Sequence, residues 1–399
     1  MNTAAVDEFR SARPIAGWRV VLTSFCMALG AWGLGFYALS AYAQFLGRAG
    51  RFSPALLSLA STWYFLVGAA ALYAVESAAR RFGVRRVTLI GLLLMAGGVS
   101  SLAFVPNVLL LFVAYTAMAF GWAAISGTAI ARIVGQWFDA RRGLALNLAL
   151  TGASAAGFVI VPGLVWAIER YGMGTGVLGM ALAVGVPLAL LIGFNIVEPD
   201  RAVPAPGTPP ATPPPALRND RHLLLLCALF AIGWLAQVAF LAQQLPLLVP
   251  KVGAAVATLT VAVATGSSLL GRLVLATVID RVDHRRATAL SFALQAVGMA
   301  LMLASDQPWA VIAGAAFFGV SVGNVITLPA MFAQREFASA HYSAVVTRIW
   351  SVGQLLFAFG PVGAGVLQSA TGSPTATLLA CGACQLLAAA LCLRRPAPA

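Results

Sequence analysis

The chain has 399 residues, of which 60% are hydrophobic and only 9% are charged, whereas charged residues make up about a quarter of an ordinary soluble domain. This composition excludes a soluble globular protein and predicts an all-α membrane protein, because the apolar runs are long and unbroken rather than short and alternating. The formal net charge is +13. The basic residues recur in short clusters between apolar runs instead of forming one patch, so nucleic acid is not an expected partner.

The first half of the sequence contains six apolar runs that are long enough to cross a bilayer. We expect an N-terminal tail over residues 1–16, followed by a half of six transmembrane helices over residues 17–197. The expected spans cover approximately residues 17–42, 54–79, 87–105, 107–137, 143–168 and 175–197.

The composition changes sharply after the sixth run. Residues 198–221 are rich in proline, so they are predicted to form a flexible linker rather than a span. Six more apolar runs follow within residues 222–393, and residues 394–399 form a short tail. These runs cover approximately residues 223–249, 254–279, 288–304, 309–333, 342–369 and 375–393. The sequence therefore predicts twelve transmembrane helices in two pseudo-symmetric halves of six.

The basic residues predict the orientation of these helices. Of the 25 Lys and Arg residues, 19 fall in loops and helix ends on the side of the two termini, and four fall on the other side. The four are Arg48, Arg51, Arg170 and Lys251. The positive-inside rule then places both termini and the linker in the cytoplasm of a multi-pass protein in a bacterial inner membrane. Two basic residues, Arg272 and Arg348, remain within predicted spans.

Arg272 is the more unusual of the two. A charge at bilayer depth costs roughly 2.5–3.5 kcal/mol on insertion scales, so it is rarely left without a partner. The predicted cytoplasmic end of this helix is at Asp280. Arg272 lies about eight residues before it, or roughly 12 Å along the helix. This distance places Arg272 near the middle of a ~30 Å hydrocarbon core. A guanidinium there can bind a carboxylate through two parallel hydrogen bonds. The alternative is a structural ion pair with an acid of a neighbouring helix.

Arg348 lies closer to the start of its span. We expect it to assist in substrate binding or in gating, and the alternative is a cation whose side chain reaches the cytoplasmic interface. Other polar groups at mid-span could replace the water around a bound anion, or they could bond helices together for packing. These candidates are Tyr37, Tyr115, Gln237, Ser268, Asn324 and Gln354.

The two halves repeat a basic loop. Residues 80–86 read Arg-Arg-Phe-Gly-Val-Arg-Arg, and residues 280–286 read Asp-Arg-Val-Asp-His-Arg-Arg. Parallel repeats with a substrate site between them are typical of alternating-access transporters. We expect a cytoplasmic gate at these loops, with Glu76 paired to Arg80 one helical turn later. The gate residues are Glu76, Arg80, Arg81, Gly83, Asp280 and Arg281.

At these loops the sequence resembles the major facilitator superfamily of transporters. The stretch Gln136–Asn147, which reads Gln-Trp-Phe-Asp-Ala-Arg-Arg-Gly-Leu-Ala-Leu-Asn, is similar to the monocarboxylate transporter and oxalate:formate antiporter families. The resemblance implies the major facilitator fold and secondary active transport of small organic anions, either monocarboxylates such as formate or short dicarboxylates such as oxalate. It implies that Arg272, within Ser268-Leu-Leu-Gly-Arg272, binds the substrate carboxylate and that Arg348 supplies a second cation. Ser268 stands where proton-coupled relatives carry an acid, so the driving ion stays open.

Two other functions remain as alternatives. One is a proton-coupled exporter of drugs or other metabolites, and the other is a non-transporting membrane receptor or assembly factor on the same fold. We do not expect an enzyme, a cofactor or a metal, because no cluster of His, Asp and Cys lies at mid-membrane, and Cys381 and Cys384 are interpreted as packing residues. The expected partners are a small carboxylate, the lipid bilayer and either a co-transported proton or an exchanged anion. The chain is expected to act as a monomer.

Overall fold

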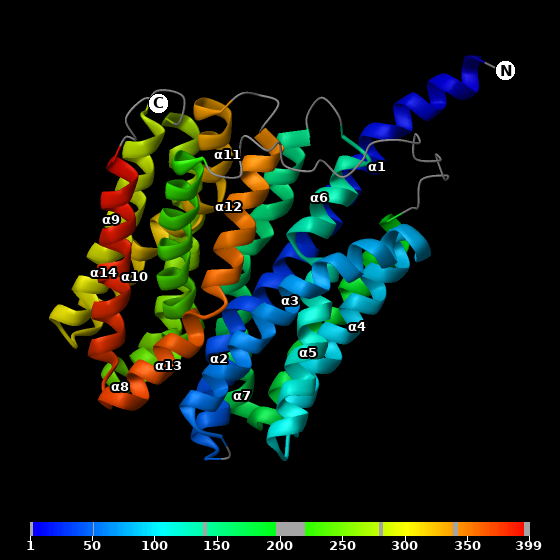
Figure 1. The fold of residues 1–399 in the computed structure, drawn as a ribbon. Helices are drawn as coiled ribbons and strands as arrows, with labels where there is room; N and C mark the ends of the chain where they lie inside the picture. Colours follow the sequence, from blue (N-terminus) through cyan, green and yellow to red (C-terminus); the bar gives the residue numbers. More distant parts are fainter. Residues whose placement is uncertain are drawn as a thin grey trace. The chain divides into compact units, whose positions relative to one another are not determined.

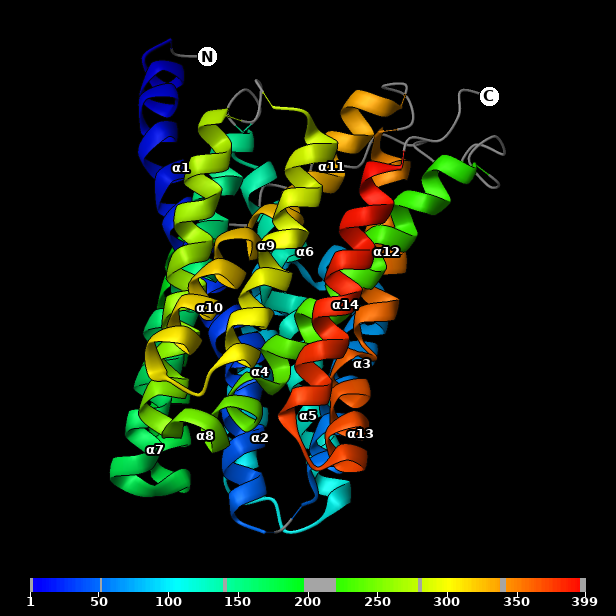
Figure 2. The same ribbon diagram turned by 90° about the vertical axis from the view of Figure 1, so that its left-hand side faces the viewer.

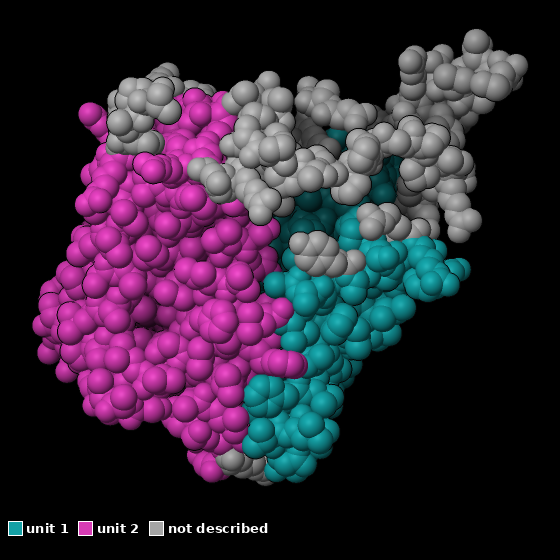
Figure 3. Space-filling model, viewed as in Figure 1, with its two compact units in different colours: residues 1–38, 67–202 teal, residues 39–66, 203–399 magenta. Residues whose placement is uncertain are grey.

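The structure is a computed structural model that describes residues 3–50, 52–138, 142–196, 220–278, 282–337 and 342–394. All regular elements in these ranges are helices (Figure 1), which confirms the all-α fold class. The chain divides into two compact units, which are coloured separately in Figure 3. The first unit contains residues 1–38 and 67–202, and the second contains residues 39–66 and 203–399. The predicted linker lies outside the described residues, apart from its last two positions.

Fifteen helical elements follow one another along the described chain. The first eight are α1 (Thr3–Trp32), the π-helix η1 (Gly33–Tyr37), α2 (Ala38–Arg48), α3 (Pro54–Phe82), α4 (Val84–Leu102), α5 (Val108–Ile125), α6 (Gly127–Gly135) and α7 (Arg142–Asn195). The others are α8 (Arg221–Val278), α9 (His284–Ala304), α10 (Pro308–Val322), α11 (Asn324–Glu336), α12 (Tyr342–Phe357), α13 (Gly360–Thr371) and α14 (Pro374–Leu393).

Two of these helices are too long to cross a bilayer once. α7 has 54 residues and α8 has 58 residues, whereas about 20 residues span the hydrocarbon core. Each is interrupted by a glycine with positive φ, 82° at Gly172 and 80° at Gly253, a backbone conformation that glycine adopts without steric cost. By length and composition the described residues hold ten candidate spans, and two of these extend across the glycines. Reading each of the two as a pair of crossings accommodates the twelve spans that the sequence predicts.

In the first unit, α1 packs along α7, and α4 packs along α5. The contact between α1 and α7 is close because Gly152 has no side chain, and a Cβ there would overlap the carbonyl oxygen of Phe25. An aromatic cluster surrounds η1, with the ring centroids of Trp32 and Trp122 separated by 4.8 Å. Small residues therefore bring the helices together, and large rings fill the space beside them.

In the second unit, α8 packs against α10, α12, α13 and α14, while α9 packs against α10 and α14 (Figures 1 and 2). Its core contains Phe230 and Trp234 of α8 together with Phe292 and Phe332 from α9 and α11. This core fixes the position of α8 relative to the helices that surround it.

The second unit also contains residues 39–66, which precede the linker by more than a hundred positions. Gln243 Nε2 donates to Ser58 Oγ over 2.6 Å, and the backbone N–H of Val362 donates to Thr62 Oγ1 over 3.1 Å. These hydrogen bonds connect α3 to α8 and α13. Nothing in the local sequence signals this arrangement, because it depends on contacts between residues that are 185 and 300 positions apart.

Candidate functional site

The centre of the candidate site is the junction of α10 and α11 in the second unit. α10 ends at Val322 and α11 begins at Asn324, and Gly323 between them keeps helical dihedral angles of −69° and −32°. Gly323 is about 15 residues, or roughly 22 Å, from Pro308 at one end, and about 13 residues, or roughly 20 Å, from Glu336 at the other. The junction therefore lies near the middle of this helical span.

Arg272 of α8 lies directly against Gly323. A Cβ at position 323 would overlap Arg272 Nε and would be only 2.7 Å from Ser268 Oγ. The missing side chain thus leaves the space that the arginine occupies. Because Gly323 is near the middle of the run from Pro308 to Glu336, this contact places Arg272 beside the middle of that run.

Close packing of α8 on α10 holds the arginine at this level. A Cβ at Gly271 would overlap the carbonyl oxygen of Val320, and a Cβ at Gly319 would overlap that of Ala264. The two helices therefore meet backbone to backbone through small residues. Since Gly271 immediately precedes Arg272, the position of the arginine follows from this helix crossing.

Two neutral polar groups share the site with Arg272. Ser268 is 1% exposed and Asn324 is 8% exposed, whereas Arg272 is half-buried. Asn324 Nδ2 donates to the carbonyl oxygen of Val320 over 3.3 Å, while Asn324 Oδ1 is buried and accepts no hydrogen bond from the described residues. The structure thus brings together three predicted residues that are up to 56 positions apart. A guanidinium, a hydroxyl and an amide in one place can replace the hydration of a carboxylate.

A second charged group lies at one end of the same unit, around a carboxylate for which the sequence predicted no partner. The carboxylate of Glu336, at the end of α11, accepts hydrogen bonds from His222 and His284 at 2.5 and 2.6 Å. Arg285 donates to both oxygens of this carboxylate, through Nε at 2.6 Å and through a terminal nitrogen at 2.7 Å. We call these four residues the Glu336 clamp. It joins the first residues of α8 and α9 to the last residue of α11.

Arg285 extends the clamp to α14, because its other terminal nitrogen donates to the carbonyl oxygens of Cys392 and Arg394 at 3.1 Å each. Burial alone would raise the pKa of Glu336, but the hydrogen bonds from His222, His284 and Arg285 outweigh burial and hold that pKa well below its usual range. The carboxylate is therefore ionised at neutral pH. The repeated basic loop contains Arg285, yet its partner Glu336 could only be found in three dimensions.

The remaining predicted residues of the second unit occupy other surroundings. Arg348 of α12 is half-buried and close enough to Cys227 of α8 to act on it electrostatically. Gln354 is partly buried one and a half turns further along α12.

Gln237 is 4% exposed and serves helix packing in this structure. Its side-chain oxygen accepts a hydrogen bond from Gln295 at 3.0 Å, and the oxygen of Gln295 accepts one from Gln385 at 2.8 Å. This chain of amides connects α8, α9 and α14 within the unit. It corresponds to the packing alternative for a polar residue inside a span.

In the first unit, Tyr115 has no exposed surface and Tyr37 is 6% exposed. Tyr37 is the last residue of η1, and its ring centroid is 5.3 Å from that of Phe36. Both tyrosines are therefore enclosed by the core of their unit in this conformation.

The predicted gate residues are only partly described. Glu76 of α3 forms an ion pair with Arg132 of α6, whereas the sequence predicted Arg80 as its partner. Gly83 precedes α4 with a φ of 91°, and the guanidinium of Arg81 is 5.2 Å from the centroid of the Phe82 ring. The side chain of Arg80 and both Asp280 and Arg281 lie outside the described residues, so the predicted pairing of Glu76 with Arg80 is not observed directly.

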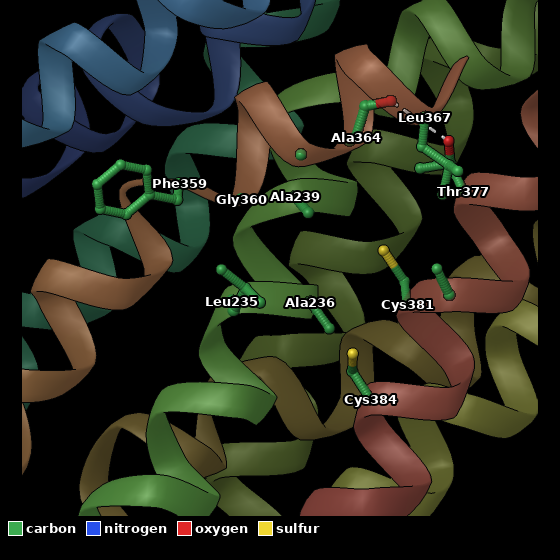
Figure 4. A pocket seen from close by; sticks show the side chains of 12 residues that line it. Leu235, Ala236, Ala239, Phe359, Gly360, Ala364, Leu367, Thr377, Cys381 and Cys384 are labelled. Carbon is green, nitrogen blue, oxygen red and sulfur yellow. Dashed lines mark hydrogen bonds between the residues drawn. The ribbon is translucent and has the colours of Figure 1, made fainter. Parts of the chain in front are cut away.

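Cys381 and Cys384 line an apolar cavity of about 130 Å³ together with residues of α8 and α13, such as Leu235 and Leu367 (Figure 4). The two thiols lie among alkyl groups. In the described part of the chain, no group of three metal-binding side chains is found.

Comparison with known proteins identifies relatives of this chain. The sequence pattern of the Major Facilitator Superfamily matches residues 20–361. Human monocarboxylate transporter 11 is 28% identical over 325 residues, which are 76% of this chain and 66% of the relative, so the chain spans just under two thirds of that protein. Bovine monocarboxylate transporter 13 is 26% identical over 407 residues, with 95% of this chain and 89% of the relative covered.

Solved structures show the same fold at low sequence identity. A point mutant of the nucleoside transporter NupG gives a TM-score of 0.76 at 12% identity and covers 95% of this chain and 99% of its own. A D-xylose-proton symporter gives a TM-score of 0.73 at 13% identity and covers 95% and 97%.

Proposed function

The chain belongs to the Major Facilitator Superfamily, and from that premise we propose that it is a secondary active transporter of small organic anions. Membership of this family makes it a membrane transporter rather than an enzyme. In the proposal, Arg272 binds the substrate carboxylate, while Ser268 and Asn324 contribute a hydroxyl and an amide. The substrates would be monocarboxylates or short dicarboxylates, because the site offers one arginine at mid-depth.

The observation that carries this proposal is the packing of Arg272 on Gly323. Side chains at Gly271, Gly319 and Gly323 would separate α8 from the helices opposite it, and the guanidinium of Arg272 occupies the space beside Gly323. Such a group is costly at mid-membrane, so an arginine that is built in by close packing indicates a function. The names of the relatives, monocarboxylate transporters 11 and 13, agree with a carboxylate as the ligand.

Several features of transport are part of the same proposal. By the charge bias, both termini would lie on the cytoplasmic side of a bacterial inner membrane. Alternating access would expose the site to either side in turn, with gating by Glu76, Arg81 and the loop that contains Asp280. Arg348 would assist the anion on its path, and Gln354 of the same helix would offer a further amide. A proton or a second anion would supply the driving force.

Ligand-dependent thermal stabilisation of the purified protein tests this proposal. Lactate, pyruvate, formate, oxalate and longer acids would be compared on the wild type and on Arg272→Ala. A bound ligand raises the melting temperature by mass action, so at least one acid is expected to stabilise the wild type but not the variant. Arg286→Ala is the matched control, because Arg286 is exposed on α9 of the same unit. If no acid stabilises the wild type, or if Arg272→Ala responds equally, the proposal fails.

A further inference from the structure

A second polar site lies near the turn of α8 at Gly253, far along the helix from His222 of the Glu336 clamp. Here the second unit contains a cavity of about 270 Å³ whose walls come from α2, α3, α8 and α13. Gln243 in its wall follows His222 by about 21 residues, or roughly 32 Å along the helix. The cavity and the clamp are therefore about one hydrocarbon thickness apart. The residues that matter for its chemistry are Arg48, Gln44, Gln243 and Gln368, with Pro54 and Pro246 beside them.

Arg48 gives the cavity a positive charge that no carboxylate balances. It is the last residue of α2, it is exposed, and its guanidinium carbon is 5.8 Å from the centroid of the Phe45 ring. Arg48 takes part in none of the ion pairs of the described residues, and no Asp or Glu lines the cavity. Lys251, near the same turn of α8, differs because it is 2.9 Å from Asp306.

The amides surround this charge from three helices. Gln243 is 3% exposed and is held in place by its hydrogen bond to Ser58, which in turn donates to the carbonyl oxygen of Pro54 over 2.7 Å. Gln44 and Gln368 are partly buried on α2 and α13. An arginine with several amides and no acid is suited to an anion, because N–H groups from both residue types can point to it.

We propose that this cavity, the Arg48 cavity, binds a small anion, either a carboxylate or a halide. Its volume holds such an ion with several of its water molecules, each of which takes about 30 Å³ in the liquid. The walls combine residues 43–57 with residues 243–368, so an anion would stabilise the packing of the earlier segment on the second half of the chain. The site is separate from Arg272 and does not depend on the function proposed for it.

Chemical modification of arginine tests this site in the purified full-length protein. Phenylglyoxal reacts with accessible guanidinium groups, and mass spectrometry measures the rates at Arg48 and Arg170 in the same sample. Arg170 is the internal control, because it is an exposed arginine of α7 that is not part of the cavity. Rates in sodium acetate and in sodium chloride would be compared with the rate in sodium gluconate, whose anion is larger, at equal ionic strength.

We expect acetate, chloride or both to slow the reaction at Arg48 by about threefold or more at saturation, with no change at Arg170. If only acetate protects Arg48 from modification, the cavity is a carboxylate site. If both ions protect it, the cavity selects anions by charge and size. Equal rates at Arg48 in all three salts would show that this arginine only balances the dipole at the end of α2 and would overturn the proposal. So would equal slowing of Arg48 and Arg170.

Two variants separate the Arg48 cavity from its alternatives. In Arg272→Ala the protection of Arg48 is expected to persist, and its loss would mean that Arg48 only reports on occupancy at Arg272. Gln44→Leu removes one amide and keeps the arginine, so it is expected to weaken the protection. If protection is unchanged in Gln44→Leu, the anion contacts Arg48 alone and the cavity is not a site.

Discussion

Arg285 and Arg272 are arginines of the same unit, and their surroundings differ in kind. Arg285 donates to both oxygens of Glu336 and to two carbonyl groups, so protein groups fill its hydrogen-bonding fork. Arg272 lies against the bare backbone of Gly323 and beside the hydroxyl of Ser268. The first arrangement fastens the ends of four helices together, and the second leaves a guanidinium within a mid-span site. The comparison teaches that two arginines of one unit can be built in by different means, one through a carboxylate of the chain and the other through close packing on a glycine.

The largest effect is expected for Glu336→Ala. Removing one partner of a buried ion pair leaves the other charge uncompensated and costs about 3–5 kcal/mol. The melting temperature of the purified protein should fall strongly, whereas Glu169→Gln, at an exposed carboxylate of α7, should leave it unchanged. If Glu336→Ala is as stable as the wild type, the Glu336 clamp does not stabilise the fold.

A smaller effect on stability, but a strong effect on binding, is expected for Gly323→Ala. The added methyl group would overlap Arg272 Nε, and such overpacking costs about 1–3 kcal/mol. Because the arginine must move, the affinity for the carboxylate should fall by roughly tenfold or more. Isothermal titration on Gly323→Ala and on Gly266→Ala, a glycine with open space beside it, would measure this. Equal affinities in the two variants would show that Gly323 does not position Arg272.

The contribution of the clamp should also depend on pH in a defined direction. The pKa of Glu336 is held below its usual range, so the stability that it contributes is fully present above the unfolded value of about 4.3 and is lost as the pH falls through the lower folded value. The difference in melting temperature between the wild type and Glu336→Gln should therefore persist to about pH 5 and shrink below about pH 4. A difference that vanishes between pH 7 and pH 5 would contradict this assignment.

The smallest effect is expected for Glu76→Gln. The Glu76 side chain is 41% exposed and that of Arg132 is 22% exposed, and exposed ion pairs contribute about 0–1 kcal/mol. Stability should change little, and a change in transport rate without a change in stability would assign the pair to gating. A loss of stability as large as that in Glu336→Ala would show that this ion pair, like the Glu336 clamp, stabilises the fold.

Much of this fold follows from the sequence, because the bilayer imposes a length and polarity on each span. The turn at Gly172 falls between the predicted spans 143–168 and 175–197. The turn at Gly253 falls between the predicted spans 223–249 and 254–279. The position of Arg272 was predicted from its distance to a helix end, and the structure adds its contact with Gly323 at the junction of α10 and α11.

Other features depend on contacts that no local pattern encodes. No sequence pattern joins His222 and His284 to Glu336, and only the folded chain brings both histidines within 2.6 Å of the carboxylate. The pairing of Glu76 with Arg132 and the packing of residues 39–66 in the second unit are of the same kind. Gln237 shows the converse limit, since a mid-span amide looks the same in sequence whether it binds a ligand or a neighbouring helix.

The most direct test of the central claim compares a carboxylate with its neutral amide on two proteins. Binding of the best acid and of the corresponding amide would be measured on the wild type and on Arg272→Ala, which completes a double-mutant cycle. If Arg272 reads the carboxylate, the wild type should prefer the acid by roughly 1.5–3 kcal/mol, the usual range for hydrogen bonds to charged groups, and Arg272→Ala should show little preference. An equal preference for the acid in both proteins would contradict the assignment of Arg272 as the carboxylate-binding residue.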